Sequence, residues 1–191
     1  MGAKILCPVD ELDFEWDRRL VERARGGDAD ATRQIVERHQ ARVYRLAYRL
    51  VGDAEGAQDL TQDTFLRVLR GLHRIEDGTA LTRWLTRTAT NLARDLWRCR
   101  RDTVEYDEGA YSDDGDDPAR HAANAQVGER IQRALMALPY RYREAFVLRH
   151  VQEMSHEEMC AHLGIGLSAV KVRIHRACRM LRDLLPEYAG E

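Results

Sequence analysis

Apolar residues recur with the 3.6-residue period of an α-helix along most of this chain. Three such stripes lie in the first hundred residues, and turn signals at 51–53 and 76–79 separate them. The expected core positions are Ile35, Val36, His39, Val43, Leu46, Ala47 and Leu50; Ala57, Leu60, Thr61, Thr64, Phe65, Val68, Leu69 and Leu72; and Leu81, Trp84, Leu85, Thr88, Ala89, Leu92 and Leu96. Because no segment alternates with period two, the pattern predicts an all-α fold.

The helical pattern stops between residues 102 and 125. Residues 102–117 contain eight acidic residues and no basic one, so this stretch cannot bury enough apolar surface to offset its ordering entropy. Periodicity resumes at Val127. We therefore expect an N-terminal extension (1–16), a helical bundle (17–101), a flexible acidic linker (102–125) and a second small helical domain (126–188).

The second domain carries the signature of a helix-turn-helix. Ser155 and Glu158 have the spacing of a capping box, Gly164 is placed to end that helix, and Ser168 is expected to cap the next one. In the following helix one face is apolar and the other basic. The apolar face comprises Val170, Ile174, Ala177 and Leu181, and the outward basic residues are Lys171, Arg173, Arg176 and Arg179.

Charge is strongly segregated although the formal net charge is only −2. Residues 84–101 hold five arginines against one acid, and residues 167–182 hold five Lys or Arg and no acid. A face of one sign repels itself, whereas ordinary solvated helices mix both signs. Two basic helices separated by an acidic stretch therefore indicate two sites for polyanions, most simply DNA.

Other classes of protein find little support in the sequence. There is no apolar run long enough for a signal peptide or membrane span, and no phosphate loop, nucleophile elbow or zinc-protease motif. We expect a cytoplasmic protein without catalytic activity, cofactor or bound metal. Cys7, Cys99, Cys160 and Cys178 lack metal-ligand spacing and are expected to stay unpaired thiols.

The stretch 138–182, "LPYRYREAFVLRHVQEMSHEEMCAHLGIGLSAVKVRIHRACRMLR", resembles region 4 of bacterial sigma factors of the extracytoplasmic-function group. It departs from the family pattern at Cys160, at Ser168-Ala169, at Val172 and at Cys178. The resemblance implies binding of the duplex −35 element by the second helix. The residues that it assigns to this contact are Ser168, Lys171, Val172, Arg173, His175, Arg176 and Arg179.

The first domain resembles region 2 of the same family. Ala57, Asp59, Gln62 and Phe65 match its region 2.2 helix, which docks on the clamp helices of the polymerase β′ subunit. The resemblance implies that core polymerase is bound by Asp59, Gln62, Asp63, Phe65 and Arg67. An ordinary amphipathic helix with a solvated outer face is the alternative at this place.

The helix that follows resembles regions 2.3 and 2.4, with matches that include Trp84, Asn91, Asp95 and Arg98. A single strand needs a basic groove and pockets for unstacked bases. The resemblance implies that the melted −10 strand is bound by Asp77, Gly78, Thr79, Ala80, Arg87, Asn91, Arg94, Arg98 and Arg101. Trp84 is expected in the core. For Trp97, stacking on a base and packing against the linker both stay open.

The predicted function is that of a sigma factor that directs promoter recognition and responds to a stress or signal. Its implied partners are core RNA polymerase (β′ clamp helices and β flap), promoter DNA and an anti-sigma factor. The anti-sigma factor could hold the chain at the inner membrane without the chain itself inserting into the bilayer. The linker could occupy the polymerase cleft or serve as a solubilising spacer. The competing interpretation is a two-domain helix-turn-helix regulator that does not bind polymerase.

Overall fold

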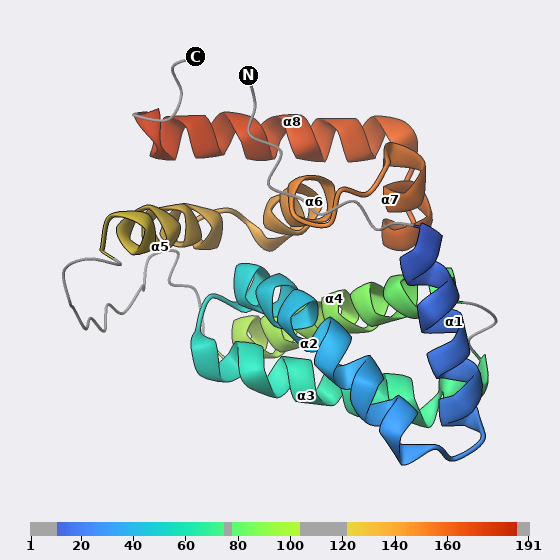
Figure 1. The fold of residues 1–191 in the computed structure, drawn as a ribbon. Helices are drawn as coiled ribbons and strands as arrows, with labels where there is room; N and C mark the ends of the chain where they lie inside the picture. Colours follow the sequence, from blue (N-terminus) through green and yellow to red (C-terminus); the bar gives the residue numbers. More distant parts are fainter. Residues whose placement is uncertain (1–10, 75–77, 104–121, 187–191) are drawn as a thin grey trace.

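The computed structural model describes residues 11–74, 78–103 and 122–186, and every regular element in these ranges is helical. The all-α prediction is thereby confirmed. In chain order the elements are α1 (Glu11–Arg25), α2 (Ala29–Val51), α3 (Ala54–Arg70), the short 3₁₀ helix η1 (Leu72–Arg74), α4 (Gly78–Thr103), α5 (Ala122–Met136), α6 (Tyr140–His150), α7 (His156–Leu163) and α8 (Leu167–Leu184). Figure 1 shows α1–α4 on one side of the molecule and α5–α8 on the other. These sets are called the N-terminal and C-terminal units.

Local caps fix the ends of the helices in the N-terminal unit. The carboxylate of Asp28 accepts hydrogen bonds from the backbone N–H of Asp30 and of Ala31, which begins α2. Gly52 ends the same helix in the left-handed conformation, with φ of 99°. Asp53 then caps α3 through the N–H of Gly56. The turn at 51–53 thus folds α2 back against α3.

α1 belongs to the N-terminal unit and begins at Glu11, inside the expected extension. Its Asp17 is only 2% exposed and lies 3.1 Å from both the His39 Nε2 and the Arg38 Nε of α2. A buried carboxylate is stable only when it is hydrogen-bonded or paired. Asp17 therefore joins α1 to α2 through specific polar contacts.

The core of the N-terminal unit follows the predicted stripes closely. Most of the expected positions on α2, α3 and α4 are buried, including Ile35, Leu60 and Leu85. Trp84 is partly buried and packs on this core, where its ring lies against Gly71 of the neighbouring turn. Leu96 is an error of the prediction, because it is 39% exposed.

Two smaller apolar clusters build the C-terminal unit around α6. One joins α5, α6 and α8 through residues such as Leu135, Leu138 and Ala177. The other joins α6, α7 and α8 and contains Met159 and Val170. Helix α6 therefore lies at the centre of the unit and holds the helix-turn-helix in place.

The two units pack directly against each other. Tyr140 and Val147 of α6 are 4% and 0% exposed and belong to the same apolar cluster as the core of the N-terminal unit. Around them, Arg143 donates to the backbone oxygen of Leu50 at 2.7 Å. The contact is thus an apolar centre with a polar margin, as in a folded core.

Candidate nucleic-acid interfaces and an apolar groove

The helix-turn-helix forms as its capping residues predict. Ser155 Oγ accepts from the N–H of Glu158 at 3.1 Å, and the Glu158 carboxylate accepts from the N–H of Ser155 at 2.8 Å. Gly164 ends α7 with φ of 67°. The expected Ser168 cap is wrong, because α8 begins at Leu167 with Gly166 as its N-cap. Ser168 is instead an exposed residue of the first turn.

Helix α8 presents one face to the core and one to solvent. Val170, Ala177 and Leu181 are buried as expected, and Ile174 packs partly against the same cluster. Of the residues expected to contact the −35 element, the exposed ones are Ser168, Lys171, Val172, His175, Arg176 and Arg179. Val172 is 47% exposed. An apolar side chain thus lies within the basic face that we expect to meet the major groove.

Two of the predicted arginines of α8 are held by the protein. The guanidinium of Arg176 donates to the Tyr142 hydroxyl at 3.0 Å, and this hydrogen bond lowers the pKa of Tyr142. Arg173 is half-buried, and its charge acts on Glu144 of α6. These two side chains are therefore less free to reach DNA than the prediction assumed, whereas Lys171 and Arg179 are fully exposed.

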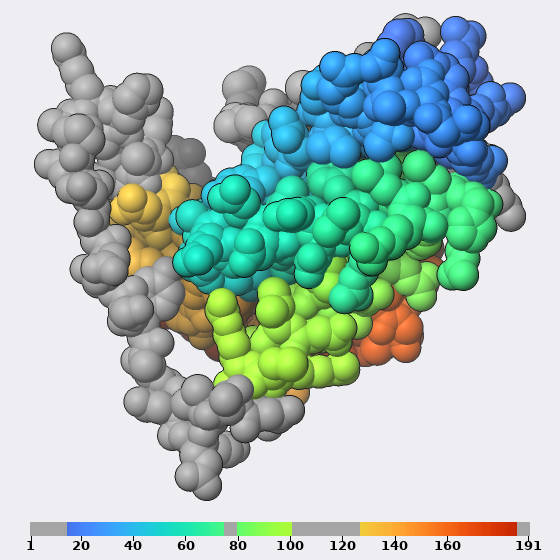
Figure 2. Space-filling view, turned by 90° about the horizontal axis from the view of Figure 1, so that it is seen from below, coloured from blue at the N-terminus to red at the C-terminus, as the bar shows by residue number. Residues whose placement is uncertain are grey.

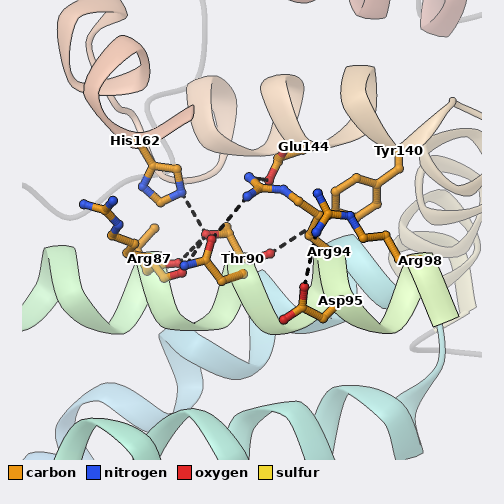
Figure 3. Close-up of polar contacts among 10 residues, drawn as sticks. Arg87, Thr90, Arg94, Asp95, Arg98, Tyr140, Glu144 and His162 are labelled. Atoms are coloured by element: carbon orange, nitrogen blue, oxygen red, sulfur yellow. Dashed lines mark hydrogen bonds and ion pairs between the residues drawn. The ribbon is translucent and has the colours of Figure 1, made fainter. Parts of the chain in front are cut away.

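The basic face of α4 is partly exposed and partly covered. Arg87, Asn91 and Arg98 are exposed. Arg94 donates to Asn91 Oδ1 at 3.3 Å and to the Glu144 carboxylate of α6 at 2.6 Å. Figure 3 shows Arg94 reaching across to α6, with Arg98 one turn further along α4. Arg94 is therefore held by α6, whereas Arg87 and Arg98 on either side of it are exposed.

Thr90 forms a second polar contact between the units. It is fully buried, and its hydroxyl lies 2.8 Å from the Nε2 of His162 in α7. Burial, together with the charges of Arg87 and Arg94, lowers the pKa of His162 to about 4. His162 is therefore neutral at pH 7 and hydrogen-bonds Thr90 as an uncharged ring.

The expected base pocket at the start of α4 is only partly visible. Asp77 lies outside the described residues, as do the side chains of Thr79 and Arg101. Gly78 begins α4, and Ala80 packs against the core of the N-terminal unit. The backbone thus places the 78–80 turn directly before the basic face of α4.

A groove of about 610 Å³ runs between α2 and α3. Figure 2 shows these two helices side by side on the face that lies opposite α8. Two of the predicted polymerase contacts, Gln62 and Phe65, line the groove, although Phe65 is 6% exposed and forms part of the core. The other three are exposed on α3 beside it: Asp59, Asp63 and Arg67.

Sequence reasoning missed the apolar rim of this groove. Tyr44 of α2 and Leu66 of α3 are 37% and 43% exposed and line it from opposite sides. The sign available in the sequence was that Tyr44 and Leu66 each place an apolar side chain on the otherwise polar outer face of its helix. It also missed the contacts that join the two units, and Trp97 proves to stack on Tyr140 with ring centroids 5.4 Å apart.

The described parts of the chain show neither a metal-binding group nor a membrane-spanning helix. Within them no group of three His, Cys, Asp or Glu could hold a metal ion, and no helix is long and apolar enough to cross a bilayer. Cys99, Cys160 and Cys178 form no disulfide, as expected, while Cys7 lies outside the described residues.

A basic helix-turn-helix packed against a bundle with a second basic helix defines a two-site DNA-binding protein. The model of sigma-70 region 2 matches residues 35–103, and that of sigma-70 region 4 matches residues 128–181. The chain therefore belongs to the sigma-70 family, and its relatives place it among the extracytoplasmic-function (ECF) RNA polymerase sigma factors.

Similar proteins support this assignment. The ECF sigma factor SigW of Bacillus subtilis is 31% identical over 179 residues, covering 88% of this chain and 96% of SigW. SigE of Mycolicibacterium smegmatis is 38% identical over 162 residues, covering 83% of this chain but 63% of SigE. The chain thus spans somewhat less than two thirds of SigE.

Among solved structures, CnrH in complex with the cytosolic domain of CnrY has a TM-score of 0.65 and 30% identity, covering 90% of this chain and 98% of that chain. RpoE of Bartonella quintana in complex with the anti-sigma factor NepR has a TM-score of 0.66 and 25% identity, covering 81% and 96%.

Proposed function

We propose that this chain is a promoter-specificity subunit of RNA polymerase that uses separate surfaces for three ligands. Helix α8 reads the −35 duplex, the basic face of α4 takes the melted −10 strand, and the α2–α3 groove docks on the β′ clamp helices. The observation that carries the proposal is the combination of these three surfaces in one chain. A helix-turn-helix regulator that does not bind polymerase needs only the duplex-binding surface of α8.

The −35 contact rests on the exposed residues of α8. Lys171 and Arg179 supply charge for phosphates. Ser168 and Val172 lie in the first two turns of α8, where base edges are read, and His175 is exposed near the middle of the helix. Arg176 is exposed but donates to the Tyr142 hydroxyl, so a contact with DNA would compete with this hydrogen bond. The helix carries no acid between residues 167 and 182, and Asp183 in its last turn is its only acidic residue.

The −10 contact rests on the cationic ridge of α4. Arg87 and Arg98 are exposed on either side of Asn91, a side chain that can both donate to and accept from a base. Gly78 and Ala80, in the first turn of α4, precede this ridge, and we expect residues 77–80 to complete a pocket for one unstacked base. Removing a base from the stack costs a few kcal/mol, so a pocket there would give strand separation and sequence choice together.

The polymerase contact rests on the apolar groove. Tyr44 and Leu66 form exposed apolar walls, and Asp59, Asp63 and Arg67 form a charged margin on α3. An apolar centre with a polar margin is the usual composition of a protein–protein interface. The groove lies between α2 and α3, and we expect a helical partner to occupy it.

An anti-sigma factor is the expected regulator, since CnrH and RpoE are both structurally similar to this chain and were solved with CnrY and NepR. We infer that such a partner covers the same three surfaces and could hold this chain at the inner membrane. The chain itself would have no enzymatic activity. The acidic segment 102–125 separates the −10 and −35 units and would run through the polymerase cleft.

Binding to core polymerase in the absence of DNA separates this function from that of a simple regulator. The expected result is a tight complex that Leu66→Glu weakens by at least about tenfold, because a charge is placed in an apolar contact. Leu96→Glu is the matched control, since that leucine is 39% exposed on α4 and does not line the groove. A chain that binds duplex DNA but not core polymerase would be a helix-turn-helix regulator.

A further inference from the structure

Tyr142 of α6 meets two arginines, one from its own helix and one from the helix that we assign to the −35 duplex. The guanidinium carbon of Arg141 lies 4.7 Å from the centre of the Tyr142 ring. From α8, Arg176 donates to the Tyr142 hydroxyl at 3.0 Å. Figure 1 shows α8 lying across α6. The cluster thus joins the basic face of α8 to the first turn of α6, where Arg141 lies.

This cluster lies at the edge of the core of the C-terminal unit. The Tyr142 ring is 7% exposed and belongs to the apolar cluster of α5, α6 and α8. Arg141 and Arg176 are both exposed. The buried ring therefore fixes the position of the hydroxyl, while the two guanidinium groups lie within reach of a ligand in solvent.

The charges around the Tyr142 hydroxyl have one sign. The hydrogen bond from Arg176 lowers the pKa of Tyr142, and the charges of Arg141 and Arg176 act in the same direction, against the effect of burial. Within the described residues, no carboxylate is among the groups that act on this hydroxyl. Two cations beside one dipole repel each other unless an anion lies between them. The cluster is therefore complementary to an anionic ligand.

The hydrogen-bonding groups of the cluster suit a phosphate. A phenol both accepts and donates, and the Tyr142 oxygen already accepts from Arg176, so its O–H is left for another acceptor. Accepting a hydrogen bond from a cation also polarises that O–H and strengthens it as a donor. The planar guanidinium of Arg141 adds N–H groups in the fork geometry that matches phosphate oxygens.

The place of the cluster beside α8 indicates which phosphate it would meet. Arg176 follows Val172 by four residues and precedes Arg179 by three, so these residues form one line along α8. A helix in the major groove has the sugar–phosphate backbone along its flanks. Because α6 packs beside α8, its first turn would lie over this backbone rather than over base edges.

We propose that Arg141 and Tyr142 of α6 form a second contact with the −35 duplex, a site for one backbone phosphate, and that Arg176 is its positioning residue. This inference rests on the proposed −35 function of α8. The Tyr142 O–H and the Arg141 guanidinium bind the phosphate, while Arg176 keeps its hydrogen bond and holds the phenol in place. The site adds affinity and fixes the register of α8 on the duplex without reading a base.

Two variants test the site without disturbing the core. Tyr142→Phe keeps the buried ring and removes only the hydroxyl, and Arg141→Ala removes a cation from an exposed position. Arg133→Ala is the matched control, because Arg133 is an exposed arginine of the same unit on α5. Urea unfolding of each variant reports any loss of packing separately from DNA binding. If Tyr142→Phe proves unstable, Arg141→Ala decides the test.

The binding measurement uses the complex of the full chain with core polymerase and a promoter that this complex selects. Single phosphates around the −35 element are replaced by uncharged methylphosphonates. We expect one replacement to weaken binding of the wild type by at least about threefold. Tyr142→Phe and Arg141→Ala should each weaken binding to unmodified DNA by a similar factor, and the replacement should then cause little further loss. Arg141→Ala should also reduce the slope of log affinity against log salt by about 1.

The Arg133→Ala control should match the wild type in affinity, salt slope and response to methylphosphonates. Wild-type or tighter binding by Tyr142→Phe would overturn the inference, because the hydrogen bond would then only restrain Arg176. Full additivity between Arg141→Ala and every methylphosphonate would overturn it too. Both results leave the proposed function intact, since the complex still selects its promoter. If no promoter is selected, the proposed function fails and the inference falls with it.

Discussion

The carboxylate of Glu144 lies 2.6 Å from the guanidinium of Arg94, although the two residues are 50 positions apart and belong to different units. Burial raises the pKa of Glu144, and the nearby Arg94 acts in the opposite direction by favouring the charged form. The pair therefore joins the helix that we assign to the −10 strand to the helix that supports the −35 reader.

Acidification should weaken the contact between the two units through His162. Arg87 and Arg94 of α4 face this ring, with Glu144 of α6 nearby, and its pKa in the packed structure is about 4. Because separation of the units would restore the ordinary His pKa near 6.5, protons bind preferentially to the separated form. The stabilisation is complete above pH 6.5 and is lost as the pH falls from there toward 4, so that the equilibrium constant for the contact falls about tenfold by pH 5.5.

Energy transfer between dyes on Glu37→Cys of α2 and Asp183→Cys of α8, with the four native cysteines replaced, checks this expectation from pH 7.5 to 5.5, because both sites are exposed. His162→Gln keeps a neutral hydrogen-bonding group and should remove most of the pH dependence above 5.5. The raised pKa of Glu144 favours the contact between the units at low pH, so it opposes the effect and is retained in that variant. A His162→Gln chain whose units separate as much as those of the wild type would assign the transition to another group.

Two glycines should respond in opposite directions to substitution by alanine. Gly52 has φ of 99°, and a Cβ there would lie 2.6 Å from the sulfur of Met136 in α5. Gly52→Ala should lower the free energy of unfolding by about 1–2 kcal/mol through backbone strain alone. Gly128 lies within α5 with open space around it, so Gly128→Ala should raise that free energy by about 0.5–1 kcal/mol. Urea titration of both variants measures the difference, and equal effects would contradict the assigned backbone conformations.

Val172 should make promoter binding depend on a thymine methyl group. It is 47% exposed on the reading face of α8, at a position where the family pattern has Ser. An exposed apolar side chain in the major groove favours the C5-methyl of thymine. Replacing single thymines of the selected −35 duplex with deoxyuridine should weaken binding of the wild type at one position, by about 1 kcal/mol. Val172→Ser should lose this sensitivity, and a methyl effect that survives in Val172→Ser would exclude the contact.

The sequence predicted what depends on local periodicity and capping. The buried face of α8 and the Ser155–Glu158 capping box follow from spacing within a single helix. Leu96 was placed in the core because it continues the spacing of Leu85 and Leu92, but the neighbouring helices do not cover that turn of α4. Ser168 was chosen as a cap by residue type, whereas α8 starts one residue earlier behind Gly166.

Periodicity and capping within single helices could not predict the contact between the two units. Arg94 and Gln132 look like ordinary solvated polar residues in sequence, and their partners lie 50 and 83 or 84 residues away. Trp97 was expected either to stack on a base or to pack against the linker, whereas it stacks on Tyr140 of α6, a partner that lies far away in the sequence. Likewise, Tyr44 and Leu66 form a groove only because α2 packs beside α3.

Run-off transcription with core RNA polymerase on a promoter library tests the central claim most directly. If the chain is a promoter-specificity subunit, its addition should produce defined start sites downstream of shared −35 and −10 sequences. Arg87→Ala with Arg98→Ala should reduce initiation, and Leu66→Glu should abolish it while Leu96→Glu retains it. The claim would be contradicted if the chain bound the library DNA but left core polymerase without any new start site.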